Sequence, residues 1–265
     1  MKKIITIIGI LCSFWMSCDK INEPYKETLI PPNDTLNSVF KTVLIEKFTG
    51  HKCSGCPEAS KEIDDLKQNY FGNRLISVAI HPSYLDDFTE PDDDYPYDFR
   101  TNDGDIIANE IGAGFLPVGS INRIKGGNAG ERCWFRSNWF DLTYDFLYDE
   151  NDSLQLPNIE IEINNSLTNK ELNISTKINI LNDLEGDYRL CLFIMEDSIT
   201  APQLDDSQRI ENYIHNDVYR CAINGVYGES LEINLTSGLE INTEHNIILD
   251  ESNNINWTND WNNIE

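Results

Sequence analysis

Basic residues are scarce in this chain, and their scarcity excludes whole classes of function. Of 265 residues, 20 are Lys or Arg and 45 are Asp or Glu, which gives a formal charge of −25 at neutral pH. Nucleic-acid backbones are held by clustered Lys and Arg, and an acidic surface repels them. The sequence therefore predicts no nucleic-acid partner. Hydrophobic residues still make up 40 % of the chain, which is enough for packed cores and too much for a disordered acidic chain.

The apolar segment at the N-terminus is too short to span a bilayer comfortably. Two lysines precede the apolar residues 4–16, and this pattern is typical of a bacterial secretory signal, which we place at residues 1–17. Cys18 follows directly and resembles a lipoprotein cleavage site, where acyl chains such as palmitate on the cysteine anchor the protein to a membrane. Residues 18–37 are rich in Pro and polar side chains, and we expect them to form a flexible tether.

A Cys-x-x-Cys motif follows an expected strand over residues 43–48 and opens an expected helix. The apolar residues after the motif recur at helical spacing: Ala59, Ile63, Leu66 and Tyr70. A strand, a turn and then Cys-x-x-Cys at the start of a helix indicates redox chemistry. The partial positive charge of the helix N-terminus stabilises a thiolate, so Cys53 is the predicted attacking sulfur and Cys56 the resolving one. We expect His51 and Lys52 to add positive charge beside them.

Two other interpretations of the cysteine pair remain open. In an oxidising compartment Cys53 and Cys56 can form a structural disulfide that never turns over, and a fully buried pair would favour this interpretation. A metal site with His51 as a third ligand needs a further ligand such as His81 or Cys133, because no second cysteine pair lies at zinc-finger spacing. We predict no metal and no cofactor.

The rest of the first half predicts a mixed α/β domain over residues 38–154. The continuous apolar run at 75–80 is typical of a strand buried on both faces. The acidic segment 86–105 lacks EF-hand spacing, so we expect a solvated insertion rather than a calcium site. Thioredoxin-like folds keep a cis-proline that faces the Cys-x-x-Cys motif, and Pro117 is the candidate. Short helices are expected near residues 107–111 and over 135–146.

From residue 155 onward the apolar period changes from helical to two. Isoleucines alternate with polar residues over 159–163 and again over 172–180, which indicates strands with one wet face. Further strands are expected over 188–195, 218–223, 231–235 and 247–249, so we predict an immunoglobulin-like sandwich over residues 155–265. The chain stops where another strand is expected, and whether the sandwich has its last edge strand stays open. Cys191 and Cys221 lie on two of these strands and are either a disulfide or buried free thiols.

Three blocks of the sequence resemble one known family. They are Val43–Gly50 running into Cys53–Pro57, Phe115–Arg123, and Tyr213–Arg220 with Asn224–Gly228. These blocks are similar to the outer membrane protein 28-related lipoproteins of Gram-negative bacteria. The resemblance implies a thioredoxin-like domain joined to a β-rich domain, and a lipid-anchored location at the outer membrane. It also implies that Cys53 and Cys56 are a redox pair and that Pro117 is the cis-proline. Glu46 is a candidate for the buried carboxylate that accepts the resolving thiol's proton, although it lies seven residues before Cys53 rather than six.

Two functions follow as hypotheses. The first is an envelope lipoprotein that exchanges thiols and disulfides through Cys53 and Cys56, with partners that are envelope proteins carrying thiols or disulfides. The second is a non-catalytic surface module for binding or adhesion that keeps the redox fold as a scaffold.

Overall fold

The computed structural model describes residues 40–231 and 234–249. The predicted signal, Cys18 and the tether lie outside these residues. Five strands form a mixed sheet in the order β3-β1-β2-β10-β7. Their bounds are β1 Val43–Phe48, β2 Leu75–Ile80, β3 Val118–Ile121, β7 Phe193–Glu196 and β10 Val218–Ala222. Strand β2 runs parallel to both β1 and β10, whereas β3 and β7 are the antiparallel edges.

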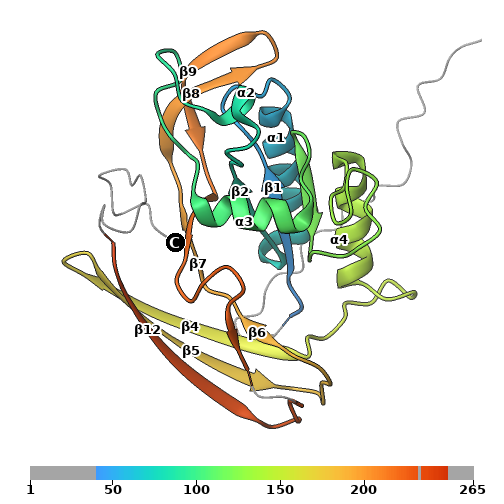
Figure 1. Ribbon diagram of the computed structural model, residues 1–265. Helices are drawn as coiled ribbons and strands as arrows, with labels where there is room; N and C mark the ends of the chain where they lie inside the picture. The colour runs from blue at the N-terminus through green and yellow to red at the C-terminus, as the bar shows by residue number, and fades with distance from the viewer. Residues whose placement is uncertain (1–39, 232–233, 250–265) are drawn as a thin grey trace, which may run out of the picture.

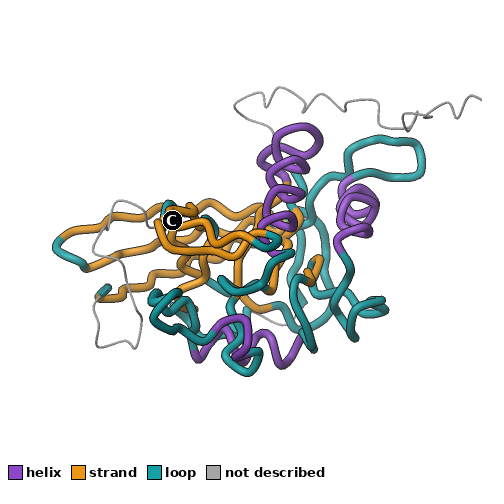
Figure 2. The backbone as a smooth tube through the Cα atoms, turned by 90° about the horizontal axis from the view of Figure 1, so that it is seen from above, coloured by secondary structure: helices purple, strands orange, loops and turns teal. Residues whose placement is uncertain are grey.

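Helices cover both faces of this sheet (Figures 1 and 2). The residues of β1 alternate between the faces: Val43 and Ile45 pack with α1 (Cys56–Leu66) and α4 (Trp139–Leu147), whereas Phe48 packs with α3 (Asn102–Ile111). The expected strand at 75–80 and the helix near 107–111 are confirmed. The shorter helical segments are η1 Lys67–Phe71, η2 Gly72–Arg74, α2 Asp86–Thr89 and η3 Arg136–Asn138. None of the helices described is long and apolar enough to cross a membrane.

The second half forms three antiparallel sheets besides its share of the mixed sheet. They are β12-β5-β4, β11-β6 and the hairpin β8-β9. The bounds are β4 Ile159–Thr168, β5 Glu171–Ile180, β6 Arg189–Leu190, β8 Ile199–Asp205, β9 Gln208–His215, β11 Glu229–Ser230 and β12 Glu240–Ile248. The period-two pattern predicted β4 and β5 correctly. On β5 the apolar residues are buried, but on the edge strand β4 Ile161 and Ile163 are 50 % and 59 % exposed.

Strands β7 and β10 come from the second half of the chain but extend the mixed sheet formed by the first half. One face of this pair, with Ile194 and Cys221, packs on the three-stranded sheet, while Phe193 and Tyr219 on the other face pack toward α3. The chain regions 188–195 and 218–223 were expected in the second domain, and part of each extends the sheet of the first. The physical reason is that both faces of these strands are apolar, so the pair can be covered on two sides while β10 binds the free edge of β2.

A buried ion pair joins β7 to β10. Arg220 Nη2 lies 2.6 Å from Glu196 Oε2, both side chains are 0 % exposed, and Arg220 also donates to the hydroxyl of Tyr97. Two charges that are removed from water together are stabilised by each other, but either one alone would be costly.

The Arg220→Met variant tests this pair. We expect a loss of about 3–5 kcal/mol in the free energy of unfolding, because Glu196 is left charged in the core, and Arg220→Met/Glu196→Met should recover much of it. Urea unfolding measures both. Lys125→Met, which breaks the exposed pair with Glu131, is the control and should cost less than about 1 kcal/mol. A single variant as stable as the wild type would contradict the interpretation.

Candidate functional site

The cysteine pair lies at the junction of β1 and α1. Cys53 and Cys56 form a disulfide with 5.4 Å between their Cα atoms. The Cys53 amide donates to the carbonyl of Gly50 and the Cys56 amide to that of Cys53, so the loop closes tightly before the helix begins. Pro57 occupies the first turn of α1, where its missing N–H costs nothing.

Pro117 lies beside the motif. The Leu116–Pro117 peptide bond is cis. A Cβ placed on Gly55, between the two cysteines, would lie 3.7 Å from Cδ of Pro117. The structure therefore places Pro117 beside the loop that carries Cys53 and Cys56, although Pro117 is far from that loop in the chain.

The hairpin β8–β9 lies over the disulfide loop, at the end of the molecule where α1 begins (Figure 1). Leu204 N donates to the carbonyl of His51 at 2.8 Å and Asp206 N donates to that of Ser54 at 3.0 Å. The side-chain amide of Gln203 donates to the carbonyls of Gly50 and Cys53, each at 3.2 Å. The hairpin thus binds four backbone carbonyls in and just before the motif.

The disulfide beneath the hairpin is buried. Cys53 is 3 % exposed and Cys56 is 1 % exposed. Proximity to Pro117 is what a redox site needs, whereas burial is what a structural bridge shows. The two observations are compatible if the hairpin moves, since neither sulfur can be attacked in the arrangement described.

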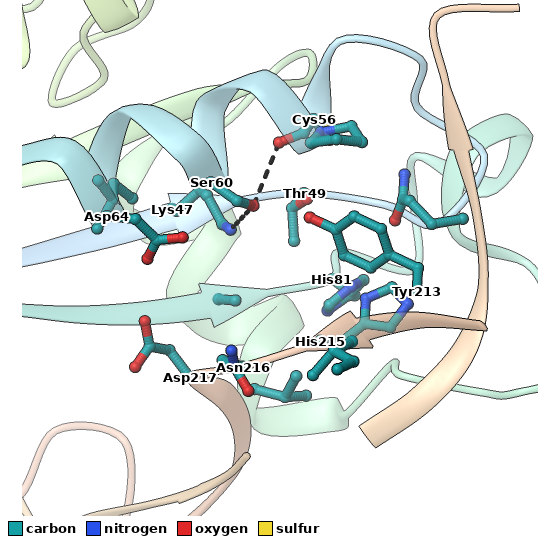
Figure 3. Close-up of a pocket in the computed structure, with 16 residues that line it drawn as sticks. Lys47, Thr49, Cys56, Ser60, Asp64, His81, Tyr213, His215, Asn216 and Asp217 are labelled. Atoms are coloured by element: carbon teal, nitrogen blue, oxygen red, sulfur yellow. Dashed lines mark hydrogen bonds between the residues drawn. The ribbon is translucent and has the colours of Figure 1, made fainter. Parts of the chain in front are cut away.

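A small cavity of about 60 Å³ lies behind the disulfide, between α1, β1 and the strands β2, β9 and β10 (Figure 3). Lys47 enters it from β1 and donates to Ser60 Oγ at 2.6 Å, and Ser60 Oγ donates to the carbonyl of Cys56 at 3.3 Å. Lys47 is only 8 % exposed, and burial lowers the pKa of its ammonium group to about 8. Asp64 faces the same space.

Glu46 does not play the part suggested for it. Its carboxylate is fully buried and receives two hydrogen bonds from Arg123, at 2.8 Å and 2.6 Å. Successive residues of a strand point to opposite faces, so Glu46 lies on the α3 side of the sheet and Lys47 on the α1 side. The residue six positions before Cys53, not seven, is the one that reaches the cavity behind the motif.

The charge expected from His51 and Lys52 is also largely absent. Burial lowers the pKa of His51, and its ring stacks on Tyr95 while Nε2 contacts the carbonyl of Glu90. Lys52 is paired with Asp92 at 3.2 Å. Within the described ranges no group of three or more His, Cys, Asp or Glu side chains is arranged to hold a metal ion.

Two more histidines surround Phe99 near the cavity. His81 and His215 lie 4.6 Å and 4.5 Å from the Phe99 ring, centroid to centroid. Burial lowers the pKa of His81 well below its usual value and that of His215 to about 3. Both rings are therefore neutral at physiological pH and act as packing groups.

The other three cysteines among the described residues are free thiols: Cys133 and Cys221 are buried and Cys191 is exposed. The disulfide considered between Cys191 and Cys221 is not formed. Cys221 packs into the cluster on the three-stranded sheet, whereas Cys191 lines an apolar groove with Phe193 and Arg123 on the other side. The two side chains face opposite sides of the β7–β10 pair, which explains why they do not meet.

Sequence reasoning missed the hairpin and Lys47. The hairpin's strands are mostly polar and exposed, so they carry weak periodic signals, and only Tyr213 and the residues after it lay in a recognised block. A lysine at 47 looks like an ordinary wet-face residue until the helix that covers it is known. The spacing of six residues from Cys53 was the one available hint.

Two solved structures resemble this chain to different degrees. The chain resembles the structure of HBP35 of Porphyromonas gingivalis with a TM-score of 0.55 and 13 % identity, over 80 % of this chain and 66 % of that one. The chain thus spans slightly less than two thirds of that protein, and the two share a fold. A protein of Agrobacterium tumefaciens aligns with a TM-score of 0.44 and 10 % identity, over 79 % of this chain and 80 % of that one.

A search of curated proteins finds no match to the chain. Residues 105–259, more than half of the chain, match the family described as outer membrane protein Omp28. The resemblance expected from the sequence blocks is therefore confirmed, and the chain belongs to the Omp28 family of outer membrane proteins.

Proposed function

We propose that this protein is a thiol–disulfide exchange protein of the cell envelope, with Cys53 attacking and Cys56 resolving. The observation that carries the proposal is the disulfide at the N-terminus of α1 next to Pro117. A thiolate at that place is stabilised by the free N–H groups and the partial positive charge of the helix. Its partners would be envelope proteins with thiols or disulfides.

A thioredoxin-like arrangement of residues 38–154 accompanies this proposal. It is supported by the order of β1, the cysteine motif, α1, the parallel β2, the cis-proline and the antiparallel β3. For the described residues of the predicted second domain, 155–231 and 234–249, we infer an immunoglobulin-like packing, supported by the apolar cluster between β5 and the β6–β7 segment.

The Cys56→Ser variant tests the exchange. Without a resolving thiol, mixed disulfides between Cys53 and client proteins should persist and accumulate severalfold over the wild type. Non-reducing gels and mass spectrometry of the Cys53 peptide measure them. The exposed Cys191 should be Ser in every sample so that it traps nothing itself, and Cys53→Ser/Cys56→Ser is the control. A Cys56→Ser protein that captures no client would refute the exchange function.

Access to Cys53 requires that the hairpin β8–β9 opens, and Gln203→Ala tests this requirement. The variant loses two hydrogen bonds to the motif, each contributing about 1 kcal/mol, so reduction of the disulfide by dithiothreitol should be about thirtyfold faster. Thr200→Ala changes an exposed residue of the same hairpin and should reduce at the wild-type rate. Equal rates in all three proteins would show that the hairpin does not control access.

The burial of both cysteines supports a second candidate function. A surface module that binds or adheres through other parts of the chain would keep the disulfide as a structural bridge. In that case Cys53–Cys56 would stay oxidised in cells and the Cys56→Ser protein would capture nothing while remaining correctly located.

We also propose that the protein is lipid-anchored at the outer membrane through Cys18. Membership of an outer membrane protein family supports the location, and the sequence around Cys18 supports the anchor. Metabolic labelling with palmitate should tag the wild type and not Cys18→Ser, since no acyl acceptor remains at that position. An untagged wild type would contradict the anchor.

A further inference from the structure

Lys47 is a buried cation at the base of the disulfide loop. Its side chain is 8 % exposed, and a single hydroxyl, that of Ser60, connects Nζ to the carbonyl of Cys56 (Figure 3). Lys47, Ser60 and Cys56 line one cavity of about 60 Å³. Such a space holds a water molecule or a few, so the amine of Lys47 and the first turn of α1 at Cys56 share one small polar environment.

Charged groups approach Lys47 from each neighbouring element. Asp64 faces it from α1, Lys67 from η1 and Asp217 from the turn between β9 and β10. The Asp217 carboxylate is shared with Lys67 at 3.2 Å and with the hydroxyl of Ser77. His81 and His215 also line the cavity, but burial keeps both rings neutral. Lys47 is therefore the cation of this cavity that reaches the carbonyl of Cys56 through Ser60.

We propose that Lys47 is a positioning residue for disulfide exchange: its ammonium group, held by Ser60 in the cavity shared with Cys56, stabilises the thiolate that Cys56 becomes on reduction. The inference rests on the proposed exchange function and adds a direction to it. A buried positive charge favours the reduced form over the disulfide, so the pair is poised to oxidise its clients.

The exchange takes place in two steps. A client thiolate attacks Sγ of Cys53, a client–Cys53 disulfide forms, and the Cys53–Cys56 bond breaks with Cys56 leaving as a thiolate beside Lys47. A second client thiolate attacks the client sulfur of this mixed disulfide, so that the client becomes oxidised and Cys53 leaves as a thiolate. Two electrons pass from the client to the pair, and the two client thiol protons go to solvent or to the cysteine thiolates.

The charge of Lys47 gives this mechanism a pH signature. Burial lowers the pKa of Lys47 to about 8, Asp217 and Asp64 raise it and Lys67 lowers it. The ammonium form is therefore dominant at pH 7 and is lost as the pH rises through about 8. Stabilisation of the Cys56 thiolate is present below that pH and fades above it. Arg at position 47 would keep its charge throughout.

Redox equilibration with glutathione between pH 6.5 and 9 tests the proposal, with the reduced fraction of the Cys53–Cys56 peptide measured by alkylation and mass spectrometry. At pH 7, Lys47→Met should shift the equilibrium constant toward the disulfide by about tenfold, which is about 30 mV for a two-electron couple. The shift should shrink toward pH 9. Lys47→Arg should match the wild type at pH 7 and be the more oxidising protein at pH 9.

Lys67→Met is the matched control, because it removes a neighbouring lysine that does not line the cavity, and it should stay within about twofold of the wild type. If Lys47→Met does not fold, the comparison of Lys47→Arg with the wild type across the pH range decides the matter. Lys47 variants that equal the wild type at every pH would overturn the assignment and leave the exchange function standing. A wild-type pair that never equilibrates with glutathione in the folded protein would overturn both.

Discussion

The buried pair of Glu196 and Arg220 holds together the part of the molecule on which the site depends. It fastens β7 to β10, and β10 in turn lies along β2 in the middle of the mixed sheet. The hairpin β8–β9 lies between β7 and β10 in the chain, so the positions of β7 and β10 fix where the hairpin begins and ends. Because β7 and β10 are covered on both faces, the hairpin has a rigid base and its tip reaches the cysteine motif.

The site that results is closed. Main-chain groups of Leu204 and Asp206 bind the loop around Cys53, and Gln203 adds two further hydrogen bonds. Behind the disulfide, Lys47 and Glu46 illustrate how one step along a strand separates two opposite charges. The carboxylate is neutralised by Arg123 on one face of the sheet, and the ammonium group enters the cavity on the other.

The acidic segment 86–105 has a structural part in this arrangement as well as a solvated surface. Asp105 accepts hydrogen bonds from Ser83 and Asp103 accepts one from the amide of Ala222. Arg209 on β9 donates to the carbonyl of Asp94 at 2.9 Å. The segment therefore runs from α2 into the first turn of α3 and contacts β10 and the hairpin. Several of its carboxylates accept hydrogen bonds from main-chain donors.

The sequence by itself determined the local elements around the motif and the family. The apolar run at 75–80, the helical spacing after Cys56 and the alternation over 171–180 depend on contacts between near neighbours in the chain, which periodicity reports directly. It also identified Cys53, Cys56 and Pro117 as residues that would meet.

Only the tertiary structure decided which side of the sheet each side chain faces and which segment covers the cysteine motif. The surroundings of Lys47 are formed by α1 and Asp217. The hairpin covers the cysteine loop because Gln203 binds the carbonyl of Cys53, which lies 150 residues earlier in the chain. Both depend on β10 joining β2, a pairing between distant segments that local periodicity does not contain. The separation of Cys191 from Cys221 depends likewise on which sides of the β7–β10 pair are covered.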